Sequence, residues 1–331
     1  MFLKKYFQNL NQFKISTNKD FEKKAIELFK IQHKHNQVYN KYCSLLGVNA
    51  EKIKNLIEIP FLPIQIFKTH KVVSNKKKHM IIFESSGTSG IKSKHYVTDL
   101  DLYKKSFTKC FERFYGYPND YLFLALLPGY IEQKNSSLVY MINYFIQLSK
   151  YEESEFYLYN YEKLYDVLIK FKKKKIKIIL FGVTHALLDF ISKYKIQMKD
   201  LIVIETGGMK GKNKEISRDE LHVKLKKGFG TNNIHSEYGM TELFSQGYSI
   251  KNGVFENPPW MKLFVRDRTN PLSNSKYGTG AINVIDLANE NSCSFIATDD
   301  YGKVNPDGSY EIIGRLEQSQ IRGCNLMFNN N

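Results

Sequence analysis

A loop built almost entirely from Ser, Gly and Thr carries the first candidate chemistry of this sequence. Residues 80–97 read MIIFESSGTSGIKSKHYV, an apolar segment that runs into small residues and emerges among lysines. The loop consists of Ser85, Ser86, Gly87, Thr88, Ser89 and Gly90. Backbone N–H groups of a glycine-rich turn can close around phosphate oxygens, while hydroxyls and the following Lys92 and Lys94 add donors and positive charge. The segment indicates a phosphate-binding loop; a tight surface turn after a strand is the alternative.

Spacing argues against three familiar motifs at this loop. A Walker loop ends in Gly-Lys-Ser/Thr, but Ile91 separates Gly90 from Lys92, and the loop does not match GxGxxG. Ser89 and Lys92 form an SxxK pair that could act as a serine nucleophile and its lysine base, but no later KTG completes that set. The loop therefore needs support from other segments.

Three later segments add polar residues of the kinds that bind nucleotides and metals. HSEYGMTEL (235–243) brings a Tyr-Gly pair and a Thr-Glu pair, ATDDYG (297–302) has two adjacent carboxylates, and IIGRLEQSQIRGC (312–324) contains Gly-Arg and later Arg-Gly. Each has an ordinary explanation when taken alone. Glu242 could be an exposed helix carboxylate, Asp300 a turn residue and Arg315 a surface ion-pair partner.

Together and in this order, the four segments resemble the adenylate-forming superfamily of acyl-CoA synthetases and related ligases. The serine loop resembles the superfamily's phosphate loop, and YGMTE its adenine and magnesium motif. TDDYG is similar to the ribose motif, with Asp299 in place of a glycine, and GRLEQSQIRG to the Gly-Arg hinge, although the usual hinge Asp is not in its expected position.

A narrower resemblance points to the acyl-protein synthetases of the bacterial bioluminescence fatty-acid reductase complex, distant relatives of phenylacetate-CoA ligase. LPGYIEQKNSSLVYMI (127–142), ETGGMKGKNKEISRDEL (205–221) and the ending IRGCNLM carry it, and it extends from roughly residue 55 to the end. Most superfamily members continue into a lid domain with a catalytic lysine, whereas this sequence stops at Asn331. The acyl-protein synthetases are similarly short there, so we expect the lid to be absent or vestigial.

The resemblance implies ATP and Mg²⁺ as cofactors and assigns a role to each motif. The loop would cradle the β- and γ-phosphates together with Lys94, Glu242 would hold Mg²⁺, and Thr241 would lie near the α-phosphate. A lone carboxylate suits Mg²⁺, which takes its other ligands from phosphate oxygens and water. The remaining expected nucleotide ligands are Gly207, Gly208, Tyr238, Gly239, Asp300 and Arg315.

A second group of expected residues concerns the acyl group. Cys324 lies beside Arg322 and Gly323, and a neighbouring cation can lower the pKa of a thiol. The resemblance implies that this cysteine carries the acyl group as a thioester. A buried, inert cysteine is the alternative. His185 follows a strand end and could line the acyl pocket, or could equally be a core or helix-capping histidine. Cys43, Cys110 and Cys293 are expected to pack.

Apolar segments separated by helical patterns predict the sheet that would position these motifs. The segments are HMIIFESSG (79–87), YLFLALLPGY (121–130), IKIILFGV (176–183) and DLIVIETGG (200–208). They predict an α/β fold with mostly parallel strands and buried faces. KNGV, YGTG and NPDGSY predict hairpins in a β-rich last third. The resulting division is an N-terminal helical region (1–55), an α/β adenylation core (56–245) and a β-rich subdomain ending at the hinge motif (246–331).

Composition limits the class of protein. Hydrophobic residues make up 42% of the 331, typical of a globular chain, and no apolar run reaches the ~18 residues that span a bilayer. Four irregularly spaced cysteines and no evident secretory signal predict a cytoplasmic protein. The formal charge of +16 fits nucleic acid or an anionic surface, but short lysine runs on solvated faces explain it without either.

The sequence thus predicts an AMP-forming ligase that activates a carboxylic acid, which the resemblance suggests is fatty, and passes it through an acyl-thioester to a reductase, acyl carrier or acyltransferase. An acyl-activating role in surface-polysaccharide or lipid assembly fits the same residues. An accessory protein that keeps the fold without turnover is another alternative, suggested by Asp299 and the missing lid. A nucleic-acid binder is suggested by charge alone.

Overall fold

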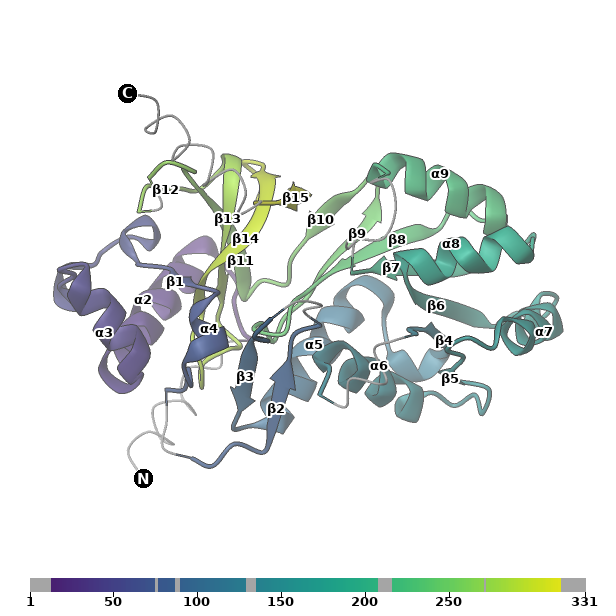
Figure 1. The fold of residues 1–331 in the computed structure, drawn as a ribbon, viewed down its shortest axis with the longest axis horizontal. Helices are drawn as coiled ribbons and strands as arrows, with labels where there is room; N and C mark the ends of the chain where they lie inside the picture. Colours follow the sequence, from purple (N-terminus) through teal and green to yellow (C-terminus); the bar gives the residue numbers. More distant parts are fainter. Residues whose placement is uncertain are drawn as a thin grey trace. The chain divides into compact units, whose positions relative to one another are not determined.

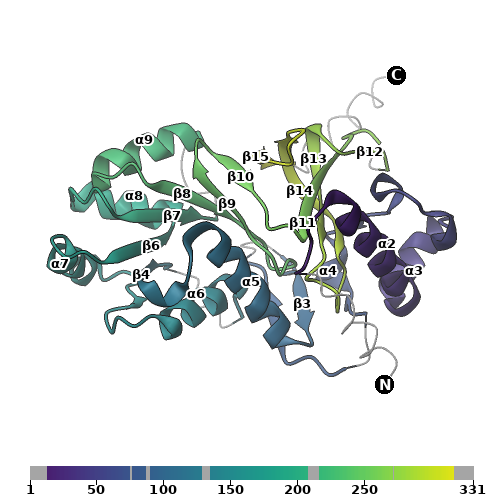
Figure 2. The same cartoon turned by 180° about the vertical axis from the view of Figure 1, so that it is seen from behind.

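The computed structural model describes residues 13–74, 77–86, 90–128, 135–207, 216–270 and 272–316. By its contacts the chain forms two compact units, drawn as ribbons in Figure 1 and from behind in Figure 2. The first unit comprises residues 1–66, 72–75 and 259–331, and the second 67–71 and 76–258. The three-part division made from the sequence stays a prediction.

The first unit begins with two helices whose ends are set by local sequence. Helix α2 (Asn18–His35) starts at a capping box, in which Asp20 N–H donates to Thr17 Oγ1 and Thr17 N–H donates to Asp20 Oδ2. Asn36 ends α2 and caps α3 (Gln37–Leu45) through Tyr39 N–H. The helices predicted for this region are confirmed. Short 3₁₀ turns follow at Ala50–Lys52 and Leu56–Glu58.

A five-stranded antiparallel sheet forms the rest of the first unit, in the order β12-β11-β13-β14-β15. Its strands are β11 (Met261–Arg266), β12 (Asn274–Ser275), β13 (Gly278–Asp286), β14 (Phe295–Val304) and β15 (Tyr310–Arg315), and β1 (Leu62–Pro63) pairs in parallel with β14. The NPDGSY segment makes the predicted hairpin between β14 and β15, with Gly308 at φ +89°. The β-rich character of the last third is confirmed.

Buried polar contacts bind the N-terminal helices to this sheet's β13–β14 loop. The Gln32 amide is fully buried and donates to the carbonyls of Asn289 (3.1 Å) and Glu290 (3.0 Å). Ser294 N–H returns a bond to Gln32 Oε1 at 2.9 Å. These contacts satisfy the backbone of a buried loop that would otherwise lack partners.

The second unit is built on a sheet ordered β10-β9-β8-β7-β6-β4-β5. Its parallel strands are β4 (Tyr121–Leu126), β5 (Glu155–Phe156), β6 (Lys177–Val183), β7 (Ile202–Thr206) and β8 (Ile234–Tyr238). Every residue of β4 is buried, as expected of a strand covered on both faces. The mostly parallel α/β sheet predicted from the sequence is confirmed.

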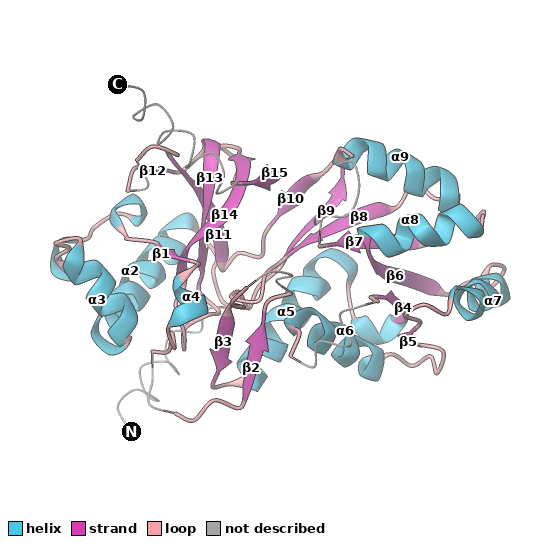
Figure 3. Cartoon of the chain, in the orientation of Figure 1, coloured by secondary structure: helices cyan, strands magenta, loops and turns pink. Residues whose placement is uncertain are grey.

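Helices lie on both faces of the sheet, as Figure 3 shows. The parallel strands are connected by α6 (Ser137–Leu148), α7 (Tyr161–Phe171), α8 (Thr184–Lys193) and α9 (Arg218–Phe229). Helix α5 (Leu100–Tyr115) and a 3₁₀ turn at Pro118–Asp120 lead into β4, and the short α4 (Ile66–Thr69) lies at the boundary of the units in sequence. Helices α8 and α9 cover one face of β6–β8, and α5 packs on the other through Tyr115, whose ring stacks on His235 of β8.

The expectation that the first apolar segment joins the parallel sheet is wrong. Strand β2 (Ile81–Glu84) pairs instead with β3 (Lys94–Val97), antiparallel, in a separate two-stranded sheet. The serine loop is therefore the loop of a hairpin. The β8 edge of the main sheet continues with antiparallel β9 (Gly247–Lys251) and β10 (Val254–Glu256), joined at Asn252-Gly253 with positive φ at both residues.

In the described residues, no helix is long and apolar enough to cross a membrane.

Candidate active site

Two hydrogen bonds between Ser85 and Ser93 close the base of the serine loop. Ser85 N–H donates to the Ser93 carbonyl at 3.1 Å, and Ser93 N–H donates to Ser85 Oγ at 3.0 Å. Gly90 has a φ of +92°, which a residue with a side chain rarely adopts. Lys94 is exposed and directly opposite Glu84 in the hairpin register. Ser86 is half-buried; Gly87, Thr88 and Ser89 lie outside the described residues.

A buried histidine that the sequence analysis missed joins this hairpin to the YGMTE segment. His95 of β3 is fully buried, and its Nδ1–H donates to the Thr241 carbonyl at 2.8 Å. Its ring packs against Phe67 and Phe244, with centroids 6.0 and 5.2 Å away. The one available signal was the alternation of KHYV, which places His95 on the same face as the buried Val97.

The YGMTE segment leaves the carboxyl end of β8 as a turn. Tyr238 ends the strand and is nearly buried, and Leu243 N–H donates to the Met240 carbonyl at 3.1 Å. Glu242 is 3% exposed, so the alternative of an exposed helix carboxylate is wrong. A carboxylate is the kind of hard oxygen ligand that Mg²⁺ takes in proteins, so Glu242 stays a candidate for binding that cation.

Three further predicted residues follow the carboxyl ends of neighbouring parallel strands. His185 is an exposed residue in the first turn of α8 and follows β6, Gly207 follows β7 with a φ of +85°, and Gly239 follows β8. The carboxyl ends of adjacent parallel strands meet at one edge, where sheets of this kind bind ligands. Gly208 lies outside the described residues.

In the first unit, the predicted ribose ligands form a cross-strand pair. Asp300 of β14 is directly opposite Arg315 of β15, and Arg315 Nε lies 3.4 Å from Asp300 Oδ1. Asp300 is 7% exposed, whereas the Arg315 side chain is largely exposed. Asp299, the departure from the ribose motif, accepts a hydrogen bond from Gln65 Nε2. The residue that replaces the usual glycine therefore has a structural partner.

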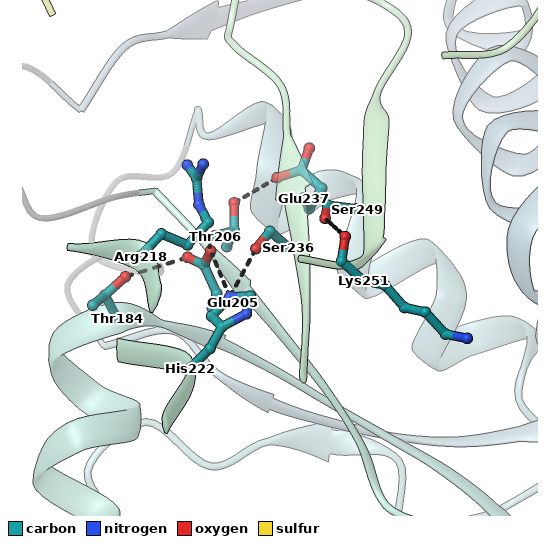
Figure 4. A network of polar contacts seen from close by, with 9 residues as sticks. All are labelled: Thr184, Glu205, Thr206, Arg218, His222, Ser236, Glu237, Ser249 and Lys251. Atoms are coloured by element: carbon teal, nitrogen blue, oxygen red, sulfur yellow. Dashed lines mark hydrogen bonds and ion pairs between the residues drawn. The ribbon is translucent and has the colours of Figure 1, made fainter. Parts of the chain in front are cut away.

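A carboxylate in β7 is the centre of a buried polar network that the sequence analysis also missed (Figure 4). Glu205 is 4% exposed; its carboxylate lies 3.7 Å from both Arg218 Nε and His222 Nε2 and accepts from Thr184 Oγ1 at 3.4 Å. Burial would raise the pKa of Glu205, but hydrogen bonds from His222 and Ser236 and the charge of Arg218 hold it below its ordinary value. The network fixes the end of β7 to helix α9.

The next strand carries a second buried carboxylate, which has the opposite electrostatic environment. Glu237 of β8 is 9% exposed and accepts from Thr206 Oγ1. Burial, together with the nearby charge of Glu205, raises the pKa of Glu237 to about 7, and the Thr206 hydrogen bond only partly opposes this. A carboxyl group in the core of the second unit therefore exists in both its neutral and its ionised form near pH 7.

Comparison with known proteins identifies the family. The family described as "Acyl-protein synthetase, LuxE" matches residues 10–331. The chain belongs to this family. The match includes Cys324, which lies outside the described residues. Among curated proteins, none matches this member of the acyl-protein synthetase family in sequence.

Solved structures share the fold of this acyl-protein synthetase family member at low identity. One is 2-hydroxyisobutyryl-CoA ligase in complex with 2-HIB-AMP and CoA (13% identity, TM-score 0.62, 93% of this chain and 70% of that one). Others are ATP-bound MatB from Rhodopseudomonas palustris (15%, 0.52, 73% and 49%) and a long-chain-fatty-acid-CoA ligase from Archaeoglobus fulgidus (14%, 0.52, 76% and 54%). The chain spans about half the length of the MatB structure. The predicted family and its adenylate-forming fold are confirmed.

The donor set of this acyl-protein synthetase family member fits magnesium that arrives with a nucleotide. Within the described residues, no group of three or more His, Cys, Asp or Glu side chains could hold a metal ion. Glu242 offers a single buried carboxylate. Mg²⁺ is commonly held by one or two carboxylates plus phosphate oxygens and water, so Glu242 with a bound triphosphate is a sufficient ligand set.

Replacing His95 with Phe is expected to destabilise the protein by about 1–2 kcal/mol, because the ring packing survives while the Thr241 carbonyl loses its donor. Urea unfolding monitored by circular dichroism measures the change. His79→Phe is the matched control, since its ring packs on Tyr96 while its Nδ1 has no partner among the described residues. Equal losses in the two variants would contradict the importance of the hydrogen bond.

Proposed function

We propose that the chain activates a carboxylic acid with ATP and Mg²⁺ as an acyl-adenylate and then converts it to an acyl-thioester. The observation that carries the proposal is the hydrogen bond from His95 to Thr241, which ties the serine-loop hairpin to YGMTE. The family match and the adenylate-forming fold support the same reaction class.

In the first half-reaction, a carboxylate oxygen of the acid attacks the α-phosphorus of ATP, and the bond to the β-phosphate oxygen breaks to release pyrophosphate. The acid is already ionised near neutral pH, so no general base is needed. The protein has to align the reactants and neutralise charge that develops on the phosphates. We assign the β- and γ-phosphates to the Ser85–Gly90 loop and Lys94, and the α-phosphate to Thr241.

Bound magnesium would supply positive charge to the triphosphate, and we assign its protein ligand to Glu242. The place of Glu242 in the YGMTE segment, one residue after Thr241, supports the assignment, because Mg²⁺ takes one or two carboxylates together with phosphate oxygens.

We assign the nucleoside to the residues that the ribose and adenine motifs marked. Asp300 would accept hydrogen bonds from the ribose hydroxyls, and Arg315, its ion-pair partner, would bind the ribose or a phosphate. Gly207 and Gly208 would let the adenine lie close to backbone, next to Tyr238 and Gly239. His185, exposed after β6, would line the acyl pocket.

In the second half-reaction, we propose that the Cys324 thiolate attacks the acyl carbonyl carbon, AMP leaves with the electrons of the acyl–phosphate bond, and an acyl-thioester remains. The acyl group, which we propose is fatty, would pass to a reductase or another acceptor. A reducing cytoplasm suits this thiol chemistry; Cys43, Cys110 and Cys293 are buried thiols.

The test uses radiolabelled fatty acids of several lengths with Mg-ATP, followed by denaturing gels and hydroxylamine treatment. A hydroxylamine-labile protein band is expected in the wild type and absent in Cys324→Ser. Cys110→Ser is the control, because Cys110 is fully buried. Label that persists in Cys324→Ser would overturn the thioester assignment, and the absence of carboxylate-dependent ATP–pyrophosphate exchange would overturn adenylation itself.

A further inference from the structure

The side chains of Glu237 and Gln246 occupy the space beside Gly239 where a larger residue would place its Cβ. A Cβ at Gly239 would lie 2.5 Å from Glu237 Oε1 and 3.4 Å from Gln246 Cγ. A side chain at residue 239 would therefore displace Glu237. The two side chains thus border the first residue of the turn that leads to Thr241 and Glu242.

Two buried polar atoms at the start of β9 have no hydrogen-bond partner within the described residues. Glu237 Oε2 accepts from Thr206. Gln246 Oε1 is buried and has no hydrogen-bond partner in the described part of the chain, and the same is true of the Tyr248 hydroxyl. Tyr248 of β9 is directly opposite Glu237, so their side chains lie on the same face of the sheet. Buried polar atoms normally have partners, so an acceptor without a donor requires an explanation.

A proton on Glu237 supplies the missing donor. An ionised carboxylate only accepts hydrogen bonds, whereas a protonated carboxyl group also donates one. With Oε2 occupied by Thr206, the O–H falls on Oε1, the atom that borders Gly239, as Gln246 Cγ also does.

The groups that face Glu237 also favour its neutral form. On the α5 face of the sheet they are Tyr103 and Tyr115 of α5, Tyr248 of β9 and His235 of β8, while Glu205 of β7 points to the opposite, α9 face. Burial raises the pKa of all three tyrosines and lowers the pKa of His235 to about 4, so these groups are uncharged near neutral pH. Glu205, which is paired with Arg218 on the α9 face, adds a negative charge that disfavours an ionised Glu237 across the sheet.

We propose that Glu237 is a positioning residue that acts as a neutral acid: it donates a hydrogen bond to Gln246, and the pair holds Gly239 and the Tyr238–Glu242 segment in the form that binds nucleotide. This rests on the nucleotide-binding role proposed above. Ionisation adds a second negative charge across the sheet from Glu205, removes the donor and releases the segment. The nucleotide-binding form is then populated only in proportion to neutral Glu237.

The test compares ATP binding by the wild type and Glu237→Gln with calorimetry at several pH values. Since binding weakens by the fraction of competent protein, the wild-type Kd is expected to rise about tenfold per pH unit above about 7, while that of Glu237→Gln changes by less than about twofold. The glutamine amide keeps a neutral donor and acceptor at every pH. Glu220→Gln, which removes an exposed carboxylate paired with Lys224, is the control and should follow the wild type.

An independent readout is the infrared carbonyl band of an un-ionised carboxyl group, which the wild type should show near pH about 6 and Glu237→Gln should lack. Loss of this band as the pH passes through the midpoint of the binding profile would support the proposal. Parallel pH profiles in the two proteins, or a band that survives in Glu237→Gln, would overturn it. Absence of ATP binding by both proteins at every pH would instead overturn the proposed function, and the positioning role with it.

Discussion

Glu242→Gln is expected to lower carboxylate-dependent ATP–pyrophosphate exchange by about 100-fold or more, because it removes the carboxylate assigned to Mg²⁺ at the phosphates. The substitution keeps the size of a side chain that is 3% exposed, so packing changes little. The loss should be partly recovered at high Mg²⁺ concentration, since a weakened metal site still fills by mass action. Exchange measured against Mg²⁺ concentration tests both expectations.

The control for this substitution is Glu290→Gln, which removes another buried carboxylate, 6% exposed, from the first unit. It should leave exchange near the wild-type rate. Wild-type exchange by Glu242→Gln at low Mg²⁺ would overturn the metal assignment, and a loss that no Mg²⁺ concentration improves would point to a role unrelated to the metal.

Local signals in the sequence predicted much of the fold because their physical causes are local. The Asn252-Gly253 and Asp307-Gly308 turns require positive φ values that glycine adopts without strain, and they form hairpins. The apolar runs of β4, β6 and β7 are buried parallel strands. The expected site residues His185, Gly207 and Gly239 follow the carboxyl ends of β6, β7 and β8.

Pairing between distant residues escaped sequence reasoning. A four-residue apolar run at Ile81–Glu84 does not reveal whether its partner is the main sheet or the strand ten residues later, and it pairs with the latter. Asp299 looked like a simple loss of a glycine, yet its partner Gln65 is 234 residues away. His95 likewise bonds a carbonyl 146 residues later. Such partners are set by the tertiary structure, which no short pattern encodes.

The two buried carboxylates on β7 and β8 illustrate the same point, since both are glutamates in apolar strands and only their neighbours separate their chemistry. Glu205 is near a cation and two hydrogen-bond partners, and its pKa is lowered. Glu237 has the Thr206 hydroxyl and the repulsion of Glu205, and its pKa is raised to about 7. One substitution, Glu to Gln, should therefore have opposite effects on stability at the two positions.

Glu205→Gln is expected to lower the free energy of unfolding by about 3 kcal/mol near neutral pH, because it removes the charge that Arg218 and His222 face in a buried site. Since the folded-state pKa of Glu205 is below its unfolded value of 4.5, the carboxylate's contribution is present above that pH and is lost as the pH falls. The difference in the free energy of unfolding between the wild type and Glu205→Gln should thus become smaller as the pH falls. Urea unfolding from acidic to alkaline pH measures it.

Glu237→Gln is the matched comparison, and its expected effect on the free energy of unfolding has the opposite sign. Its folded-state pKa of about 7 lies above 4.5, so the stability that neutral Glu237 contributes is complete below pH 4.5 and is lost as the pH rises through 7. At alkaline pH the variant should be more stable than the wild type by about 1–3 kcal/mol, and the two should converge in acid. Destabilisation of both variants at alkaline pH would mean that the folded protein is stabilised by ionised Glu237, contrary to the burial and the nearby charge that raise its pKa.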